Sequence, residues 1–404
     1  MANPEDTAPG AGSTPIEPPS TDEVFAALRT VIDPELHVDI VSLGMVPDVS
    51  IDGGTVTVSV KLTIGGCPLR AEIKREIENR VGVHPGVDSV RIDWGEMTPE
   101  ERSEVMGRAR RRAQEQAPDT AVPARCRVIA VASGKGGVGM SSVTVNLAAG
   151  LAERGSTVGV LDADIWGFSV PRLFGMSDRM EASEVDGRPR IIPNRREIGN
   201  GVLEVVSTGF LVEESTALMW RGLMLTKAVE QFLNDVAWGD LDYLLIDMPP
   251  GTGDVQMGLA RMLPRTEILV VTTPARAAQK VAQRAADMAR RSFLPVIGVV
   301  ENMSAFVCDH GDSYALFGSG GGAELADDIG VPLLASVPLE PALASGGDNG
   351  DPVVLSGQGP SAVALRDLVT QIAEQVAPPR DSDVDMSGCS ARLLDAVAAA
   401  LDGA

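Results

Sequence analysis

The sequence predicts an α/β fold, with a mainly parallel, doubly wound sheet preceded by a small α/β domain. One observation is an apolar run at residues 127–132, followed by a glycine-rich stretch at 133–141 and a helical pattern at 142–152. A strand, a glycine loop and a helix in this order are typical of a phosphate-binding loop. The other is that apolar runs and helical stretches then alternate, as in a parallel sheet covered on both faces.

Composition favours a globular protein and excludes two classes of partner. The 404 residues suffice for two or three domains, and 44% of them are hydrophobic. A net charge of −22 and only 3% aromatic residues argue against binding to nucleic acid or to anionic membranes. No run is apolar enough to span a bilayer and residues 1–20 lack a signal-peptide pattern, so we expect a cytoplasmic protein. Its four scattered cysteines are expected to be free thiols.

Changes in composition divide the chain into five segments. We expect disorder at 1–20, a small α/β domain at 21–98, a charged helical linker at 99–124, the large domain at 125–378, and a tail at 379–404. The basic run at 108–112 is interpreted as a solvated helix face, because the chain as a whole is acidic. A short helix at 390–402 is expected to pack on the domain or on a partner, since its polar face is not basic.

The small domain is predicted to mix helices with a hairpin. The expected elements are a helix at 22–32, strands at 46–51 and 55–62 joined by a turn at 52–54, a helix at 69–81 and a strand at 87–94. Cys67 directly precedes the second helix, where a helix N-terminus favours the thiolate that binds soft metals. A small buried side chain is an equally good interpretation of this cysteine.

Polar residues follow the strands expected in the large domain. These strands are predicted at 127–132, 158–161, 243–246, 267–271 and 296–300. Ligands of parallel sheets bind beyond the carboxyl ends of the strands. Asp164, Asp247 and Asn302 follow three of these strands, so we expect them to converge on the glycine loop.

The glycine loop has the chemistry of an anion site. Its glycines allow several backbone N–H groups to face one anion, and the following helix adds the positive end of its dipole. The residues expected to contact a nucleotide are Gly134, Lys135, Gly136, Gly137, Val138, Gly139, Met140, Ser141 and Ser142. The general pattern ends in Gly-Lys-Ser/Thr, but Met140 stands here in place of the lysine.

Three further side chains are suited to magnesium and water chemistry. Ser141 begins the helix after the loop and can give its hydroxyl oxygen to Mg²⁺, while Asp247 would act on the ion through a bound water. Asp164 is a candidate for orienting the water that attacks the γ-phosphate. A strand-end aspartate alone also serves as a helix cap, whereas two beside a glycine loop favour a nucleotide site.

Four segments of the large domain are distinctive in combination, at 133–139, 162–167, 247–254 and 299–304. Together they resemble the Mrp-type iron–sulfur cluster carrier ATPases, which belong to the deviant-Walker P-loop group of ParA and MinD. Residues 20–98, with their Asp-Pro-Glu at 33–35 and Cys-Pro at 67–68, resemble the Mip18-like iron–sulfur assembly domain often fused ahead of that ATPase. The resemblance covers most of residues 20–375.

The resemblance implies a homodimer that sandwiches ATP with Mg²⁺ and carries an iron–sulfur cluster, of the [4Fe–4S] type, to apoproteins and from assembly scaffolds. Lys135 would reach phosphate across the dimer interface and take part in catalysis with Asp164, which would help to position the attacking water. Ser141 would ligate Mg²⁺, and Asp247 would be the Walker B acid. Asn302 would contact adenine, and the segment 247–254 would sense the γ-phosphate.

The chain departs from this family pattern at two places. Met140 cannot neutralise phosphate charge, so we expect binding to survive and hydrolysis to fall, unless another lysine compensates or the loop tolerates the loss. The family's Cys-x-x-Cys is reduced to Cys308, with His310 and Cys67 as further candidate ligands. A symmetric dimer then offers two thiolates where a [4Fe–4S] cluster usually takes four, which predicts a labile or differently ligated cluster.

Two other functions stay open beside the carrier with weak ATPase activity. Met140 suggests a nucleotide-binding dimeric switch or scaffold without turnover. A positioning ATPase of the ParA/MinD kind would need a basic DNA-binding surface or a basic tail, and the sequence shows neither. The second glycine run, at 318–322, follows no clear strand and is expected to be a turn before a helix from Ala323.

Overall fold

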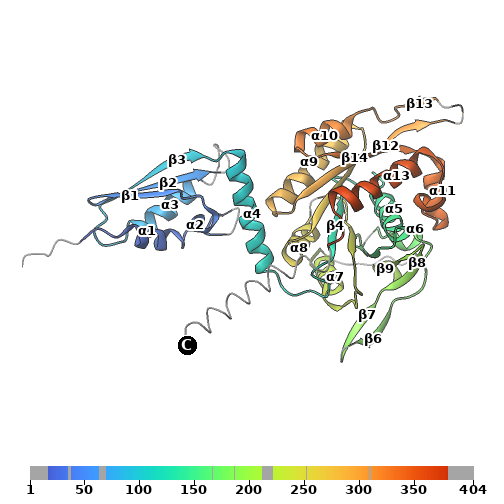
Figure 1. Ribbon diagram of the computed structural model, residues 1–404, viewed down its shortest axis with the longest axis horizontal. Helices are drawn as coiled ribbons and strands as arrows, with labels where there is room; N and C mark the ends of the chain where they lie inside the picture. Colours follow the sequence, from blue (N-terminus) through green and yellow to red (C-terminus); the bar gives the residue numbers. More distant parts are fainter. Residues whose placement is uncertain are drawn as a thin grey trace, which may run out of the picture. The chain divides into compact units, whose positions relative to one another are not determined.

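The computed structural model describes residues 17–34, 38–62, 70–165, 167–185, 187–211, 222–251, 253–308, 310 and 312–380. The chain divides into two compact units, Met1–Arg112 and Ala113–Ala404 (Figure 1). Both mix helices with a sheet, and the larger sheet is mainly parallel, so the predicted fold class is confirmed. In the described part of the chain, no helix is long and apolar enough to cross a membrane.

The first unit is a three-stranded sheet with helices packed on it. Its elements are α1 (Thr21–Leu28), α2 (Ile40–Leu43), β1 (Asp48–Asp52), β2 (Thr55–Leu62), α3 (Arg70–Val81), β3 (Ser89–Glu96) and α4 (Pro99–Glu115). Strands β1 and β2 form the expected antiparallel hairpin, and β3 runs parallel to β2. Helix α1 ends at Leu28 and not at Ile32 as predicted, and Ile32 is 48% exposed beyond its last turn. The core is made by alternate residues of β2 with α1 and α3.

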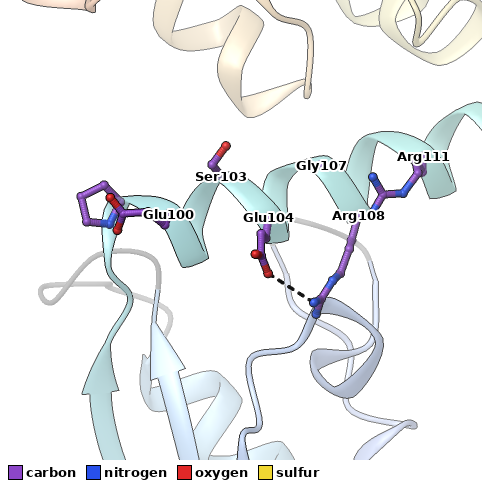
Figure 2. A pocket seen from close by; sticks show the side chains of 7 residues that line it. Glu100, Ser103, Glu104, Gly107, Arg108 and Arg111 are labelled. Atoms are coloured by element: carbon purple, nitrogen blue, oxygen red, sulfur yellow. Dashed lines mark ion pairs between the residues drawn. The ribbon is translucent and has the colours of Figure 1, made fainter.

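Helix α4 covers most of the segment expected as a linker, and it packs on the first unit. Its Val105 and Ala109 are buried, and Glu101 pairs with Lys61 at 2.5 Å. The Arg108 guanidinium donates a hydrogen bond to the Leu43 carbonyl at 3.1 Å. Figure 2 shows Arg108 also paired with Glu104, at 3.5 Å, beside a hollow that α4 lines. Part of the basic run therefore holds this unit together.

The second unit is organised by a nine-stranded sheet in the described residues. Its strands are β4 (Arg127–Ala132), β5 (Thr157–Asp162), β8 (Asn194–Ile198), β9 (Gly201–Ser207), β10 (Tyr243–Asp247), β11 (Glu267–Thr272), β12 (Val296–Val307), β13 (Ser313–Tyr314) and β14 (Leu333–Leu339). The spatial order is β13-β12-β11-β4-β10-β5-β9-β8, with β14 paired to β12. Strands β8 and β13 are antiparallel to their neighbours, and the other pairs are parallel. A separate hairpin joins β6 (Glu181–Val185) and β7 (Arg188–Ile192).

Helices cover both faces of this sheet (Figure 1). They are α5 (Met140–Glu153), α6 (Val170–Leu173), α7 (Gly222–Asp235), α8 (Asp254–Met262), α9 (Arg276–Arg291), α10 (Gly321–Ile329), α11 (Pro341–Asn349), α12 (Val353–Ser356) and α13 (Pro360–Gln371), with a 3₁₀ turn at Thr208–Phe210 and a π-helical turn at Ile372–Val376. Strand β4 shows the division, since Ile129 and Val131 pack with α5 and α13 while Val128 and Ala130 face α7 to α10. The sheet is therefore doubly wound.

Strand β12 is much longer than the sequence predicted. It was expected to end at Val300, but it continues through Asn302 to Val307. Met303 has φ = 56°, a left-handed conformation that is uncommon for a residue other than glycine, and the pairing with β14 shifts register between Asn302 and Phe306. The polar residues expected after the strand therefore lie within it, at a bulge. Beyond the bulge, β12 and β13 form a hairpin that extends past the flanking helices (Figure 1).

Candidate nucleotide-binding site

The glycine loop joins the central strand β4 to helix α5. Gly137 and Gly139 have φ = 79° and 78°, a backbone conformation that glycine adopts without strain. Gly134 lies against α9, where an added Cβ would come within 2.2 Å of the Val281 backbone. The Ser133 hydroxyl donates to the Lys135 carbonyl at 2.9 Å and closes the turn. These glycines are therefore required by the shape of the loop and by its contact with α9.

Helix α5 begins at the loop with its first backbone N–H groups free of intrahelical partners. The loop leads into an N-terminus whose dipole favours an anion. Met140 is the first residue of the helix; it is 8% exposed and packs in the core with Val138 and Val143. Lys135 is exposed on the loop. The charge that normally follows the last glycine is replaced by a side chain that packs in the apolar core.

Asp247 ends β10 next to this loop, in register with Val131 of β4. Its side chain is 1% exposed, and its Oδ1 accepts a hydrogen bond from the Thr144 hydroxyl at 2.9 Å. Its Oδ2 is buried and has no hydrogen-bond partner among the described residues. Buried polar atoms are normally paired, so an unpaired carboxylate oxygen indicates a place for a bound water or cation.

Burial determines the charge state of this carboxyl group. Burial raises the pKa of Asp247 to about 6, and the Ser141 and Thr144 hydroxyls oppose that increase. The charge of Asp164 raises it further, so the structure brings Ser141, Asp164 and Asp247 close together. A carboxyl group with this pKa is mostly ionised at pH 7, and a cation bound beside it would favour the charged form further.

Asp162 is a residue of this site whose role the sequence analysis missed. It is fully buried beside Asp247 in the sheet register, and burial followed by the charge of Asp247 raises its pKa well above the usual range. Its Oδ2 accepts bonds from the Ser207 hydroxyl at 3.1 Å and from the Ser169 amide at 3.2 Å, and its Oδ1 accepts from the Asp164 amide at 3.2 Å. Asp162 thus fixes the loop that carries Asp164.

The segment after β10 is fastened to the phosphate-binding loop. The Gly251 amide donates to the Ser133 carbonyl at 3.0 Å, and Met248 is bonded in the same way to Val131 at 3.1 Å. The Gln256 amide group donates to the Gly251 carbonyl at 2.8 Å, while its Oε1 is buried without a partner in the described residues. Backbone hydrogen bonds therefore join the start of the 247–254 segment to the phosphate-binding loop and to the strand before it. Thr252 lies outside the described residues.

Asn302 lies against the phosphate-binding loop. It is 2% exposed, its Nδ2 donates to the Val138 carbonyl at 2.9 Å, and its Oδ1 accepts from the Met303 amide at 3.0 Å. A Cβ at Gly139 would lie 2.2 Å from the same Nδ2. The amide of Asn302 thus fills the space that the missing side chain of Gly139 leaves open.

The second glycine run is built differently from a nucleotide site. Helix α10 begins at Gly321, two residues before the predicted Ala323, and the Gly322 amide donates to Glu301 Oε2 at 2.5 Å. Glu301 is 4% exposed. The N-terminus of this helix is therefore already occupied by a carboxylate of the protein.

The structure describes only some of the candidate ligands for an iron–sulfur cluster. Cys308 follows β12 with intermediate exposure, its amide donates to the Asp312 carbonyl at 3.0 Å, and His310 is exposed. Cys67 and residues 390–402, where the sequence predicts a helix, lie outside the described residues. Within the described ranges, no three His, Cys, Asp or Glu side chains are grouped to hold a metal ion. Burial raises the pKa of the Cys126 thiol to about 12, so this cysteine stays protonated.

A backbone-built anion site between a central parallel strand and the next helix, with a strand-end carboxylate beside it, defines a P-loop NTPase. Comparison with known families agrees with this class. Residues 125–377 match the family of the NUBPL iron-transfer P-loop NTPase, and residues 21–94 match that of an iron-sulfur cluster assembly protein. The chain belongs to the NUBPL-type P-loop NTPases, with an iron-sulfur cluster assembly domain in front.

Several relatives match most of the chain. An iron-sulfur cluster carrier protein of Mycobacterium leprae is 44% identical over 341 residues, which are 82% of this chain and 87% of the relative. Its counterpart in Synechocystis is 41% identical over 362 residues, covering 89% of this chain and 98% of the relative. A solved nucleotide-binding protein of Archaeoglobus fulgidus in complex with ADP is 35% identical, with a TM-score of 0.50, and covers 58% of this chain and 90% of its own.

Proposed function

We propose that this protein is an ATP-binding carrier of iron–sulfur clusters that hydrolyses ATP weakly and passes clusters to apoproteins in the cytoplasm. The observation that carries the proposal is the phosphate-binding loop beside the unpaired Oδ2 of Asp247, in a chain 44% identical to a carrier protein. The A. fulgidus relative, which was solved with ADP, supports nucleotide binding at this loop. ATP would supply the phosphoanhydride bond that is cleaved.

The loop residues 134–142 would hold the phosphates through backbone N–H groups. Ser141 would bind Mg²⁺ directly, and Asp247 would hold one of its waters through the unpaired Oδ2. Asp164 would orient the attacking water, and exposed Lys135 would reach phosphate in the second subunit of a homodimer. Asn302 would face adenine only with the N–H that remains after its bond to Val138.

The cluster would be cargo, held between the two subunits. Cys308 at the end of β12 would supply one thiolate from each subunit, and a [4Fe–4S] cluster would need further ligands. The candidates for these ligands are His310, which is exposed, and Cys67, which lies outside the described residues. Such a cluster would be released easily, which suits a carrier that hands it on.

Anaerobic reconstitution with iron and sulfide tests the cluster assignment. We expect Cys308→Ala to lose most of the bound iron and sulfide, whereas Cys126→Ala, which removes a fully buried thiol, should retain the wild-type amount. Equal iron contents in Cys308→Ala and in the wild type would remove Cys308 from the site.

Met140 favours a second candidate function, a dimeric switch that binds nucleotide without turnover. Its apolar side chain leaves the phosphate charge without the usual cation. These two candidate functions are distinguished by measuring phosphate release and, by sedimentation, dimerisation in the same preparation. A switch would dimerise with MgATP and release no phosphate, while a carrier with weak ATPase activity would release it slowly.

A further inference from the structure

Strand β12 contacts both glycine loops of the large domain through consecutive side chains. Glu301 accepts the Gly322 amide at the start of α10, and Asn302 donates to Val138 in the phosphate-binding loop. Both side chains are almost completely buried, at 4% and 2% exposure. The carboxyl half of β12 is therefore held on two sides, and one of them is the phosphate-binding loop.

Met303, the next residue, has the left-handed backbone conformation. Its amide is bonded to the Asn302 side chain, and its methyl carbon lies 3.7 Å from the position that a Cβ at Gly139 would take. Strand pairing with β14 is interrupted from here to Phe306. Left-handed residues other than glycine persist only where neighbouring contacts hold them. Here one such contact is the Asn302 side chain, which is itself bonded to Val138 in the phosphate-binding loop.

The bulge leads directly to Cys308, five residues after Met303. Phe306 and Tyr314 stack across the hairpin with ring centroids 6.4 Å apart, and the Cys308 amide is bonded to Asp312. The hairpin is thus joined to the sheet through the bulge at Met303 and through the pairing of Phe306 with Leu339 of β14. A change in the conformation at Met303 would change the angle of the hairpin at this connection, and Cys308 would move with it.

We propose that Asn302 and Met303 are positioning residues that connect the phosphate-binding loop to the Cys308 hairpin within one subunit. Binding of phosphate reorganises the loop around Gly139, the bond from Asn302 to Val138 transmits the change to Met303, and the hairpin presents Cys308 differently. This inference rests on the proposed nucleotide site and adds to it a route by which nucleotide controls the cluster-binding cysteine. The route does not need a change in the dimer interface.

The test is the alkylation rate of Cys308 in the full-length apoprotein, followed by peptide mass spectrometry with and without MgADP. We expect MgADP to change the wild-type rate by about two- to tenfold, the range that corresponds to one net hydrogen bond. Met303→Gly, which changes no residue assigned to the nucleotide site, should bind MgADP in calorimetry but show no such change in the alkylation rate. Asn302→Ala removes a proposed adenine contact and should bind MgADP more weakly, so its alkylation rate is measured at saturating MgADP, where it should also show no change. The matched control is Asn146→Ala, which removes another buried asparagine bonded to the backbone at Ser142 and Val354, away from β12.

Three outcomes overturn the proposal. A wild-type protein that binds MgADP with no change in Cys308 alkylation contradicts it. So does a full response in both variants, which would assign the coupling to another route such as the dimer interface. A response lost equally in Asn146→Ala would show a general effect of loosening the domain. Absence of MgADP binding in the wild type would instead refute the proposed function, so the two failures are distinguishable.

Discussion

Met140 is a core residue at the position where a P-loop normally carries its cation. Its side chain is 8% exposed and packs with Val138 and Val143, so in the proposed site the phosphates would be held by backbone N–H groups and by Lys135. Met140→Lys should raise the ATPase rate about a hundredfold, as expected for one added donor that stabilises developing charge. Met140→Gln, of similar size but without charge, serves as the control. Equal turnover in wild type and Met140→Lys would show that the lysine is not needed here.

The raised pKa of Asp247 predicts that the stability of the apoprotein depends on pH, which can be measured without substrate turnover. Its pKa in the folded protein is about 6, above the ordinary carboxyl value of 3.8, so the folded state holds the proton more tightly than the unfolded state. The stability of the apoprotein therefore falls as pH rises from about 4 through about 6. Asp247→Asn should remove this loss and stabilise the apoprotein at pH 7 by on the order of 1–3 kcal/mol in urea unfolding.

In the proposed site, the same ionisation would control magnesium binding with the opposite dependence on pH. Only the charged carboxylate can hold a water of Mg²⁺, so affinity for MgADP should fall as pH drops below about 6. In Asp247→Asn the affinity should be low at every pH. An affinity in the wild type that does not change between pH 5 and pH 7, at roughly one unit either side of the pKa, would contradict this assignment.

At the scale of elements, the contact between the phosphate-binding loop and β12 depends on Gly139. In Gly139→Ala, the alanine would have to adopt the left-handed backbone conformation, which destabilises the folded state. Its Cβ would also collide with Asn302 Nδ2, at a distance of 2.2 Å. Gly137→Ala is a matched control, because φ is 79° and nothing lies within 4 Å. We expect about 1–2 kcal/mol of lost stability for Gly137→Ala and more for Gly139→Ala. Thermal unfolding measures the stability of both variants. Equal losses would show that the contact with Asn302 does not contribute to stability.

The elements differ in how far the sequence could predict them. The order of strand, glycine loop and helix around 127–152 is local, and β4 has the predicted bounds. The bulge in β12 was not predictable, because it depends on pairing with β14 and on the bond from Asn302 to Val138, 164 residues away. Asp162 was missed for the same reason, since its hydroxyl partner Ser207 is 45 residues away. The chemistry of a site is visible in the sequence, whereas the side chains that hold it in place come from distant segments.

At the level of the whole molecule, the other predictions depend on one property of the phosphate-binding loop. We expect its backbone N–H groups, with Asp247 beside them, to bind nucleotide although the usual lysine is replaced by Met140. Ligand that binds only the folded state stabilises it, by about 2.7 kcal/mol at a free concentration one hundred times the dissociation constant. Nucleotide with magnesium should therefore raise the unfolding temperature of this protein.

Isothermal titration of the full-length protein with MgADP and MgATP at pH 7 tests this claim most directly. We expect saturable binding of both nucleotides, near one per chain, which is lost without magnesium and weakened in Asp247→Asn. A wild-type titration without binding heat, together with an unfolding temperature that neither nucleotide shifts, would contradict it.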